Sequence, residues 1–174
     1  MTGDNGLHTA NIIVMGVSGS GKSLVGARLA RALDLPFFDA DDFHSPANIE
    51  KMSNGIPLSD ADRAGWLNDL AALIQRQPGL VLACSALKKD YRDRLRQAAP
   101  DMTFLYLKGD IDTIWSRHSQ REDHYFSGRR MLESQFAQLE APSDAEALII
   151  DIARSAEAVI EDCLSKLQAR YERL

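Results

Sequence analysis

Eight residues from Gly16 to Ser23 read GVSGSGKS and fit the phosphate-binding pattern G-x-x-x-x-G-K-[ST]. The glycines at positions 19 and 21 permit backbone conformations that residues with a Cβ resist, so successive N–H groups can point at a phosphate. The lysine places a positive charge on the β- and γ-phosphate oxygens, and the next hydroxyl is placed to bind Mg²⁺. We therefore expect the whole loop to bind a nucleoside triphosphate: Gly16, Val17, Ser18, Gly19, Ser20, Gly21, Lys22 and Ser23.

Three aspartates and a histidine follow two phenylalanines in FFDADDFH, residues 37–44. Carboxylates are tolerated beside a phosphate where a cation lies between them, so we expect Asp39 to bind Mg²⁺ together with Ser23. Asp41 is the candidate base that accepts the proton of an attacking hydroxyl. Asp41 and His44 also suit the hydroxyls of a neutral polyol, although His44 is alternatively an exposed loop residue. Strand alternation predicts that Asp42 points away.

Basic residues near the same edge are candidates for an anionic group on the acceptor. Lys88 follows the apolar run VLACS, and Arg63 lies in PLSDADRAGW. Either residue is alternatively an ordinary surface cation. Arg92 and Arg94 are expected on the solvated face of a helix, and Trp66 in the core.

The stretch over 115–130, WSRHSQREDHYFSGRR, is polar, rich in arginine and placed between two predicted helices. This composition predicts a mobile lid at about 117–130 that closes over the nucleotide and excludes water. We expect Arg117 and Arg121 to bind the nucleotide, with Arg121 stabilising charge in the transition state. His124 is a candidate substrate contact, or alternatively a surface residue.

The elements that must position these residues alternate between strand and helix. Short apolar runs predict buried strands over 11–16, 35–40, 80–85, 103–108 and 147–152. Helical patterns fall over 22–33, 59–77, 89–98 and 112–119, with further helices from about 130 and from 155. The predicted fold is therefore α/β, with a five-stranded parallel sheet, right-handed crossovers and helices on both faces.

Composition narrows the class of protein further. The chain has 174 residues and a net charge of −5, so no global basic field favours nucleic acid or an anionic membrane. Cys84 and Cys163 sit in apolar patterns without CxxC spacing, which predicts buried free thiols. The absence of a signal-like start or a long apolar run leads us to expect a cytoplasmic protein. We expect one domain over 11–174 after a flexible lead at 1–10.

Several motifs together resemble the gluconokinases, the ATP-dependent gluconate kinases. They are MGVSGSGKS, DxDxxH, NIEKM, G-x-PL-x-D-x-DR-xx-WL, CSALK-x-x-YRD-x-LR, FLYLKGD and ML-x-SQF-xx-LE-x-P, spread from about residue 12 to residue 152. CSALK, and NIEKM together with DR-xx-WL, are specific to this family. Where the family lid usually reads R-x-GHF, this chain has REDHYF, which places Glu122 and Asp123 before His124.

The resemblance implies a nucleoside-monophosphate-kinase-like P-loop fold with three α/β/α layers. It also implies Mg·ATP as donor, D-gluconate as acceptor, 6-phospho-D-gluconate as product, and a homodimer. By position, Asp41 matches the base, and Arg117 and Arg121 match lid arginines. The residues themselves leave two alternatives open. One is a kinase for another small acceptor, such as shikimate or a nucleotide; the other is a nucleotide-dependent switch, although no N-K-x-D motif occurs.

Overall fold

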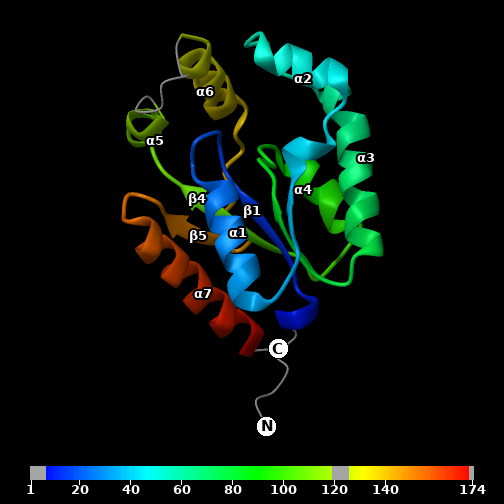
Figure 1. The fold of residues 1–174 in the computed structure, drawn as a ribbon, viewed down its shortest axis with the longest axis vertical. Helices are drawn as coiled ribbons and strands as arrows, with labels where there is room; N and C mark the ends of the chain where they lie inside the picture. Colours follow the sequence, from blue (N-terminus) through cyan, green and yellow to red (C-terminus); the bar gives the residue numbers. More distant parts are fainter. Residues whose placement is uncertain (1–6, 119–125, 173–174) are drawn as a thin grey trace.

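A single parallel sheet forms the centre of the computed structural model, which describes residues 7–118 and 126–172. Its strand order is β2-β3-β1-β4-β5, and every neighbouring pair is parallel (Figure 1). The strands are β1 (Asn11–Met15), β2 (Phe37–Asp39), β3 (Leu80–Ala83), β4 (Thr103–Lys108) and β5 (Leu148–Asp151). The predicted fold class is confirmed.

Seven α-helices connect and cover the strands in the described residues. They are α1 (Lys22–Leu33), α2 (Pro46–Ser53), α3 (Asp60–Arg76), α4 (Lys89–Arg96), α5 (Ile111–His118), α6 (Phe126–Gln138) and α7 (Ala156–Glu172). Figure 1 shows α2 and α6 above the same end of the sheet, with α3 and α7 on its two sides. This arrangement leaves the ends of the strands between α2 and α6.

The sheet is buried on both faces because consecutive residues of β1 enter different cores. Ile12 and Val14 belong to the apolar cluster that includes residues of α1 and α7. Ile13 and Met15 belong to the cluster that includes residues of α3 and α4. A continuous apolar run is typical of such a strand, and all four side chains are fully buried.

Helix α3 begins where the sequence predicts. Ser59 Oγ accepts a hydrogen bond from Asp62 N at 3.1 Å, and Asp62 Oδ2 accepts one from Ser59 N at 2.9 Å, which is a capping box worth about 1 kcal/mol. Lys51 Nζ on α2 donates to both Asp62 carboxylate oxygens, at 2.8 and 3.0 Å. The cap therefore also ties α2 to the start of α3.

Three segments of the backbone differ from the sequence prediction. Helix α2 was not predicted, although Ser45 caps it and Pro46 stands in its first turn. Helix α6 begins at Phe126 rather than near residue 130, so both ends of the expected lid at 117–130 are helical. Leu7 packs on the core and Ala10 is buried, so residues 7–10 are not part of a flexible lead.

Candidate active site

The loop between β1 and α1 has the backbone that the phosphate-binding pattern requires. Gly19 and Gly21 have φ values of 82° and 100°, which L-residues with a Cβ rarely adopt. Gly16 has φ 152°, and a Cβ there would come within 2.7 Å of Ser20 Oγ. The loop thus leads into the N-terminus of α1, where backbone N–H groups favour an anion.

Lys22 lies at the start of α1, half-buried, with Nζ donating to the Val17 carbonyl at 3.0 Å. Burial lowers the pKa of Lys22, while Asp41, the Cys84 thiol and Asp39 act in the opposite direction. Both aspartates are close enough to act on the pKa of Lys22, but neither forms an ion pair with it among the described contacts. This position leaves it available to phosphate oxygens.

Ser23 and Asp39 form the pair that the sequence predicts for a metal. Ser23 Oγ donates to Asp39 Oδ2 at 2.8 Å, and Asp39 Oδ1 accepts from Asp41 N at 3.0 Å. One hydroxyl and one carboxylate fit Mg²⁺, which takes its other ligands from phosphate oxygens and waters. No cluster of three or more His, Cys, Asp or Glu residues suited to a metal occurs in the described ranges.

A cleft of about 260 Å³ opens beside the phosphate loop. Its lining comes from the loop and the start of α1, from the segments after β2 and β3, from α2, α3 and the connection between them, and from α6: Ser18, Lys22, Asp41, His44, Met52, Leu58, Arg63, Trp66, Ser85, Met131 and Gln135. The predicted residues Lys22, Asp41, His44 and Arg63 therefore meet around one cavity. Lys88 does not line it.

Asp41 stands at the mouth of this cleft with 78% of its side chain open to solvent. Partial burial in the cleft and the neighbouring Asp39 raise the pKa of Asp41 above its ordinary 3.8, against the opposing effect of Lys22. An accessible carboxylate with a raised pKa is a better proton acceptor than an ordinary one. Asp42 is exposed, in agreement with the prediction that it points away.

His44 is held against α3, and its side chain is only 4% exposed, so the alternative of an exposed loop histidine is wrong. Its ring stacks on Trp66 with centroids 4.4 Å apart, and Trp66 Nε1 donates to the Ala40 carbonyl at 2.7 Å. Burial and then Arg63 lower the pKa of His44 to about 4. The imidazole is therefore neutral at physiological pH.

The tautomer of His44 follows from Asn48. The Asn48 amide nitrogen donates to the Asp62 carbonyl at 2.8 Å and lies 3.3 Å from His44 Nδ1. Because this nitrogen is a donor, Nδ1 accepts and Nε2 carries the proton. Nε2 lies 4.0 Å from Asp41 Oδ1. His44 thus offers one N–H donor on the cleft side, next to the candidate base.

Arg63 is 7% exposed and anchored through one nitrogen. Its Nη1 donates to the Leu58 carbonyl at 2.8 Å, to Gln138 Oε1 at 3.0 Å and to Tyr91 Oη at 3.2 Å. Lys88 instead pairs with Asp60 at 2.9 Å, and Tyr91 also donates to Asp60. Of the two predicted cations, the structure brings Arg63 to the cleft and engages Lys88 outside it.

A second cavity of about 380 Å³ borders the same loop. It is lined by Gly19 to Gly21, by Leu24 and Val25, by Arg117, and by residues at the end of β5 and the start of α7: Ile152, Arg154, Ser155, Ala156 and Val159. Arg117 Nη2 donates to the Arg154 carbonyl at 3.3 Å. The structure therefore places Arg117 beside the phosphate loop, whereas Arg121 and His124 lie outside the described residues.

Comparison with known proteins shows which family the chain belongs to. The shikimate kinase family model matches residues 18–168. The thermoresistant gluconokinase of Escherichia coli (strain K12) is 43% identical over 162 residues, which cover 90% of this chain and 92% of that protein. The chain belongs to the gluconokinase family. The resemblance carried by CSALK and the other motifs is confirmed.

Solved structures agree with the gluconokinase assignment. A gluconokinase from Sinorhizobium meliloti 1021 superimposes with a TM-score of 0.89 at 38% identity, covering 95% of each chain. A shikimate kinase from Bacteroides thetaiotaomicron reaches 0.62 at 19% identity, covering 94% of this chain and 98% of that one, and so shares the fold. The shikimate kinase match therefore reflects the P-loop kinase architecture common to both.

Two parts of this gluconokinase-family site were missed by sequence reasoning. Gln135 on α6 lines the cleft, and its Oε1 accepts from Ser18 N at 2.6 Å. It lies in the SQF motif, which was the available signal. The residues after β5 that line the second cavity carried no motif, but ligands of parallel α/β sheets collect at the carboxyl ends of strands.

Proposed function

We propose that the protein transfers the γ-phosphoryl group of Mg·ATP to the C6 hydroxyl of D-gluconate, giving 6-phospho-D-gluconate and ADP. The observation that carries the proposal is the cleft where Lys22, Asp41, His44 and Arg63 meet. It joins a phosphate-binding loop to hydrogen-bonding groups for a polyol and a cation for a carboxylate. The relatives of the chain from Escherichia coli and Sinorhizobium meliloti are named gluconokinases.

The two substrates are proposed to bind in the two cavities. The adenosine end of ATP fits the second cavity, where Leu24 and Val25 offer apolar surface beside the Arg117 guanidinium. The loop N–H groups and Lys22 hold the phosphates. Ser23 and Asp39 would hold Mg²⁺, which neutralises charge on the β- and γ-phosphates when bound. Arg121, which belongs to the segment 119–125, is proposed to bind the same phosphates.

Gluconate is proposed to lie in the cleft with its C6 hydroxyl at Asp41. The Asp41 carboxylate accepts the hydroxyl proton as the oxygen attacks the γ-phosphorus, and ADP leaves in line. The neutral His44 donates Nε2–H to a hydroxyl oxygen. Arg63 faces the gluconate carboxylate, because its Nη1 contacts fix the planar guanidinium that suits a carboxylate. His124 remains a proposed further contact.

The experiment that tests the activity is a coupled ATPase assay across a panel of acceptors: D-gluconate, other sugar acids, shikimate and AMP. We expect ADP formation that depends on gluconate, with the product phosphorylated at C6 by ³¹P and ¹³C NMR. Turnover of shikimate or AMP without gluconate would contradict the proposal. Nucleotide binding with no acceptor-stimulated turnover would favour the switch.

Arg63 and Lys88 make a matched pair for locating the carboxylate. Arg63→Lys is expected to raise KM for gluconate about 10- to 100-fold, because a lysine cannot reproduce the anchored planar fork. Lys88→Met is expected to change it by less than about threefold, because an exposed ion pair to Asp60 contributes little. Steady-state kinetics at saturating ATP measure both. A larger effect of Lys88→Met than of Arg63→Lys would indicate that Lys88 binds the gluconate carboxylate.

The metal pair predicts a change in Mg²⁺ dependence. Ser23→Ala and Asp39→Asn are each expected to raise the Mg²⁺ concentration for half-maximal activity about tenfold or more, because each removes a ligand or its charge. Asp42→Asn is the control, since it removes a nearby charge from an exposed position. Magnesium titrations at fixed free ATP measure the shift. Equal midpoints in Asp39→Asn and Asp42→Asn would remove Asp39 from the metal site.

The family resemblance also leads us to expect a cytoplasmic homodimer that binds neither nucleic acid nor membrane. None of the helices in the described ranges combines the length and the hydrophobicity that crossing a lipid bilayer requires. Cys84 and Cys163 are buried free thiols, as predicted. Sedimentation equilibrium measures the mass in solution, and a monomer of 19.3 kDa would contradict the dimer.

A further inference from the structure

Arg92 is a buried arginine that the cleft does not contain. It lies on α4 and is 1% exposed, which contradicts the prediction of a solvated face, whereas Arg94 on the same helix is partly exposed and contacts Asn68. A buried guanidinium is costly unless every N–H finds an acceptor and the charge is balanced. The burial of Arg92 therefore needs an explanation other than the stability of α4.

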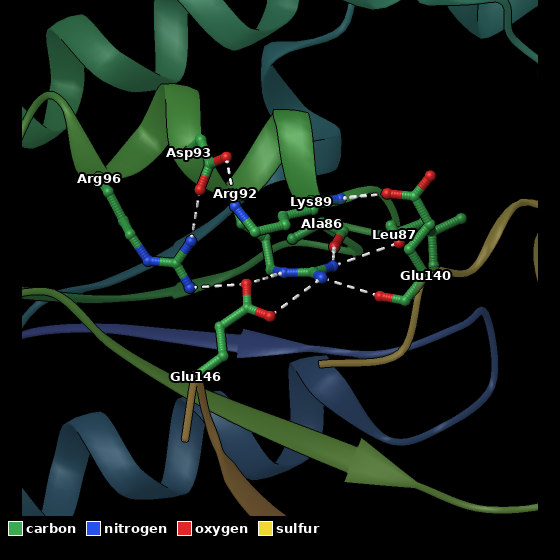
Figure 2. Close-up of polar contacts among 8 residues, drawn as sticks. All are labelled: Ala86, Leu87, Lys89, Arg92, Asp93, Arg96, Glu140 and Glu146. Atoms are coloured by element: carbon green, nitrogen blue, oxygen red, sulfur yellow. Dashed lines mark hydrogen bonds and ion pairs between the residues drawn. The ribbon is translucent and has the colours of Figure 1, made fainter. Parts of the chain in front are cut away.

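All five N–H donors of Arg92 are used, as Figure 2 shows. Nη1 donates to the carbonyls of Ala86 and Leu87, at 2.7 and 3.2 Å. Nη2 donates to the Glu140 carbonyl at 2.8 Å. Nε donates to Glu146 Oε1 at 2.7 Å and Nη2 to Oε2 at 3.4 Å, so the Glu146 carboxylate balances the charge.

The first two acceptors belong to the segment 84–88, which joins β3 to α4. Ala86 has φ 45°, a left-handed conformation that a residue with a Cβ adopts only when its surroundings impose it. Ser85 lines the acceptor cleft, and Tyr91 on the next turn accepts from Arg63. Arg92 thus holds a strained segment at one wall of the cleft.

The third acceptor belongs to the other wall. Glu140 follows α6, the helix whose Met131 and Gln135 line the cleft. The same junction carries two further bonds: Glu140 N donates to the Leu87 carbonyl, and Lys89 N donates to Glu140 Oε1, both at 2.8 Å. Arg92 and Glu140 therefore join the end of α6 to the segment after β3.

Glu146 supplies the negative charge that balances Arg92 at this junction. Its Oε1 also accepts from Arg96 Nη2 at 2.7 Å, and Arg96 Nη1 donates to Asp93 at 2.9 Å (Figure 2). Burial opposes ionisation of Glu146, but the hydrogen bonds from Arg92 and Arg96 outweigh it and hold its pKa below the usual 4.5. The carboxylate is thus ionised at physiological pH.

We propose that Arg92 is a positioning residue that sets the distance between the two walls of the acceptor cleft, the segment after β3 and helix α6. The inference rests on the proposed function for its substrate. Arg92 touches neither the cleft nor the phosphate loop, so its loss should misplace the acceptor more than the nucleotide. Small displacements of a bound reactant reduce its rate of reaction strongly.

The test compares Arg92→Lys with Arg94→Lys, the same substitution on the outer face of the same helix. Arg92→Lys keeps the charge beside Glu146 but cannot reach all five acceptors. We expect it to raise KM for gluconate about tenfold while KM for ATP stays within about twofold. Arg94→Lys should leave both unchanged. Equal changes in the two KM values, or none, would overturn the proposal.

A second variant avoids the buried position in case Arg92→Lys does not fold. Glu140→Ala removes an exposed carboxylate that caps Lys89 N, and it is expected to raise KM for gluconate about threefold with ATP unaffected. No selective effect on gluconate in this variant would also overturn the proposal.

Hydrogen exchange measures the junction without any substrate. The amides of Lys89 and Glu140 should exchange faster in Arg92→Lys than in the wild type and Arg94→Lys, and equal rates would contradict the role. A wild-type protein inactive on gluconate would refute the proposed function while leaving this exchange result standing.

Discussion

Asp41→Asn is expected to lower kcat by about 10³-fold while ATP binds as in the wild type. The amide keeps the size of the side chain but cannot accept the hydroxyl proton. The phosphate loop and the Ser23–Asp39 pair are untouched, and Asp41 N still donates to Asp39. Stopped-flow or single-turnover kinetics measure the chemical step, and calorimetry with a non-hydrolysable ATP analogue measures nucleotide affinity.

The pH profile gives a second readout of the same residue. Partial burial and Asp39 raise the pKa of Asp41, so the wild type should lose activity as the pH falls through a value above 3.8, where the base becomes protonated. His44, with a pKa of about 4, adds no limb near neutral pH. This acid limb should disappear in Asp41→Asn, with Asp42→Asn as control. Near-normal turnover in Asp41→Asn would remove Asp41 from the base role.

Lys22→Ala is expected to reduce turnover to below about 1% of the wild type, since removing one preorganised charge at the transition state costs about 10²- to 10³-fold. The ammonium lies half-buried at the loop, where water cannot fully replace it. KM for gluconate should change far less than kcat. The coupled assay measures both constants.

Arg28→Ala is the matched control, because it removes an exposed cation from the same helix, paired with Glu157 at 3.4 Å. We expect this variant to keep wild-type kinetics. Substantial activity in Lys22→Ala, or equal losses in the two variants, would contradict a specific role for Lys22 at the phosphates.

Local pattern predicted much of the site, because parallel strands deliver their carboxyl ends to one edge. The phosphate loop follows β1, and Asp39 ends β2. Although β3 lies between these two strands, their carboxyl ends share one edge of the sheet, and Ser23 Oγ lies 2.8 Å from Asp39 Oδ2. Arg63 lies on α3, a helix predicted over 59–77 and observed over Asp60–Arg76. These predictions needed only hydrophobic periodicity and a motif.

The predictions that failed concern residues whose contact partners lie far away in the sequence. Helix α4 reads KDYRDRLR, which is typical of a solvated surface, yet Arg92 is buried because Glu146 lies across from it 54 residues later. Gln135 contacts Ser18 across 117 residues. Helix α2 spans only Pro46–Ser53, and its buried residue is the polar Asn48, so no buried apolar side chain marks this helix in the sequence.

The most direct test of the account is a crystal structure with gluconate, Mg²⁺ and a non-hydrolysable ATP analogue. We predict the Asp41 carboxylate within about 3 Å of the C6 hydroxyl, and that hydroxyl in line with the γ-phosphorus. Arg63 should face the gluconate carboxylate. A structure in which gluconate binds with its C6 hydroxyl away from the γ-phosphate, or in which Asp41 lies beyond hydrogen-bonding reach of it, would contradict the account.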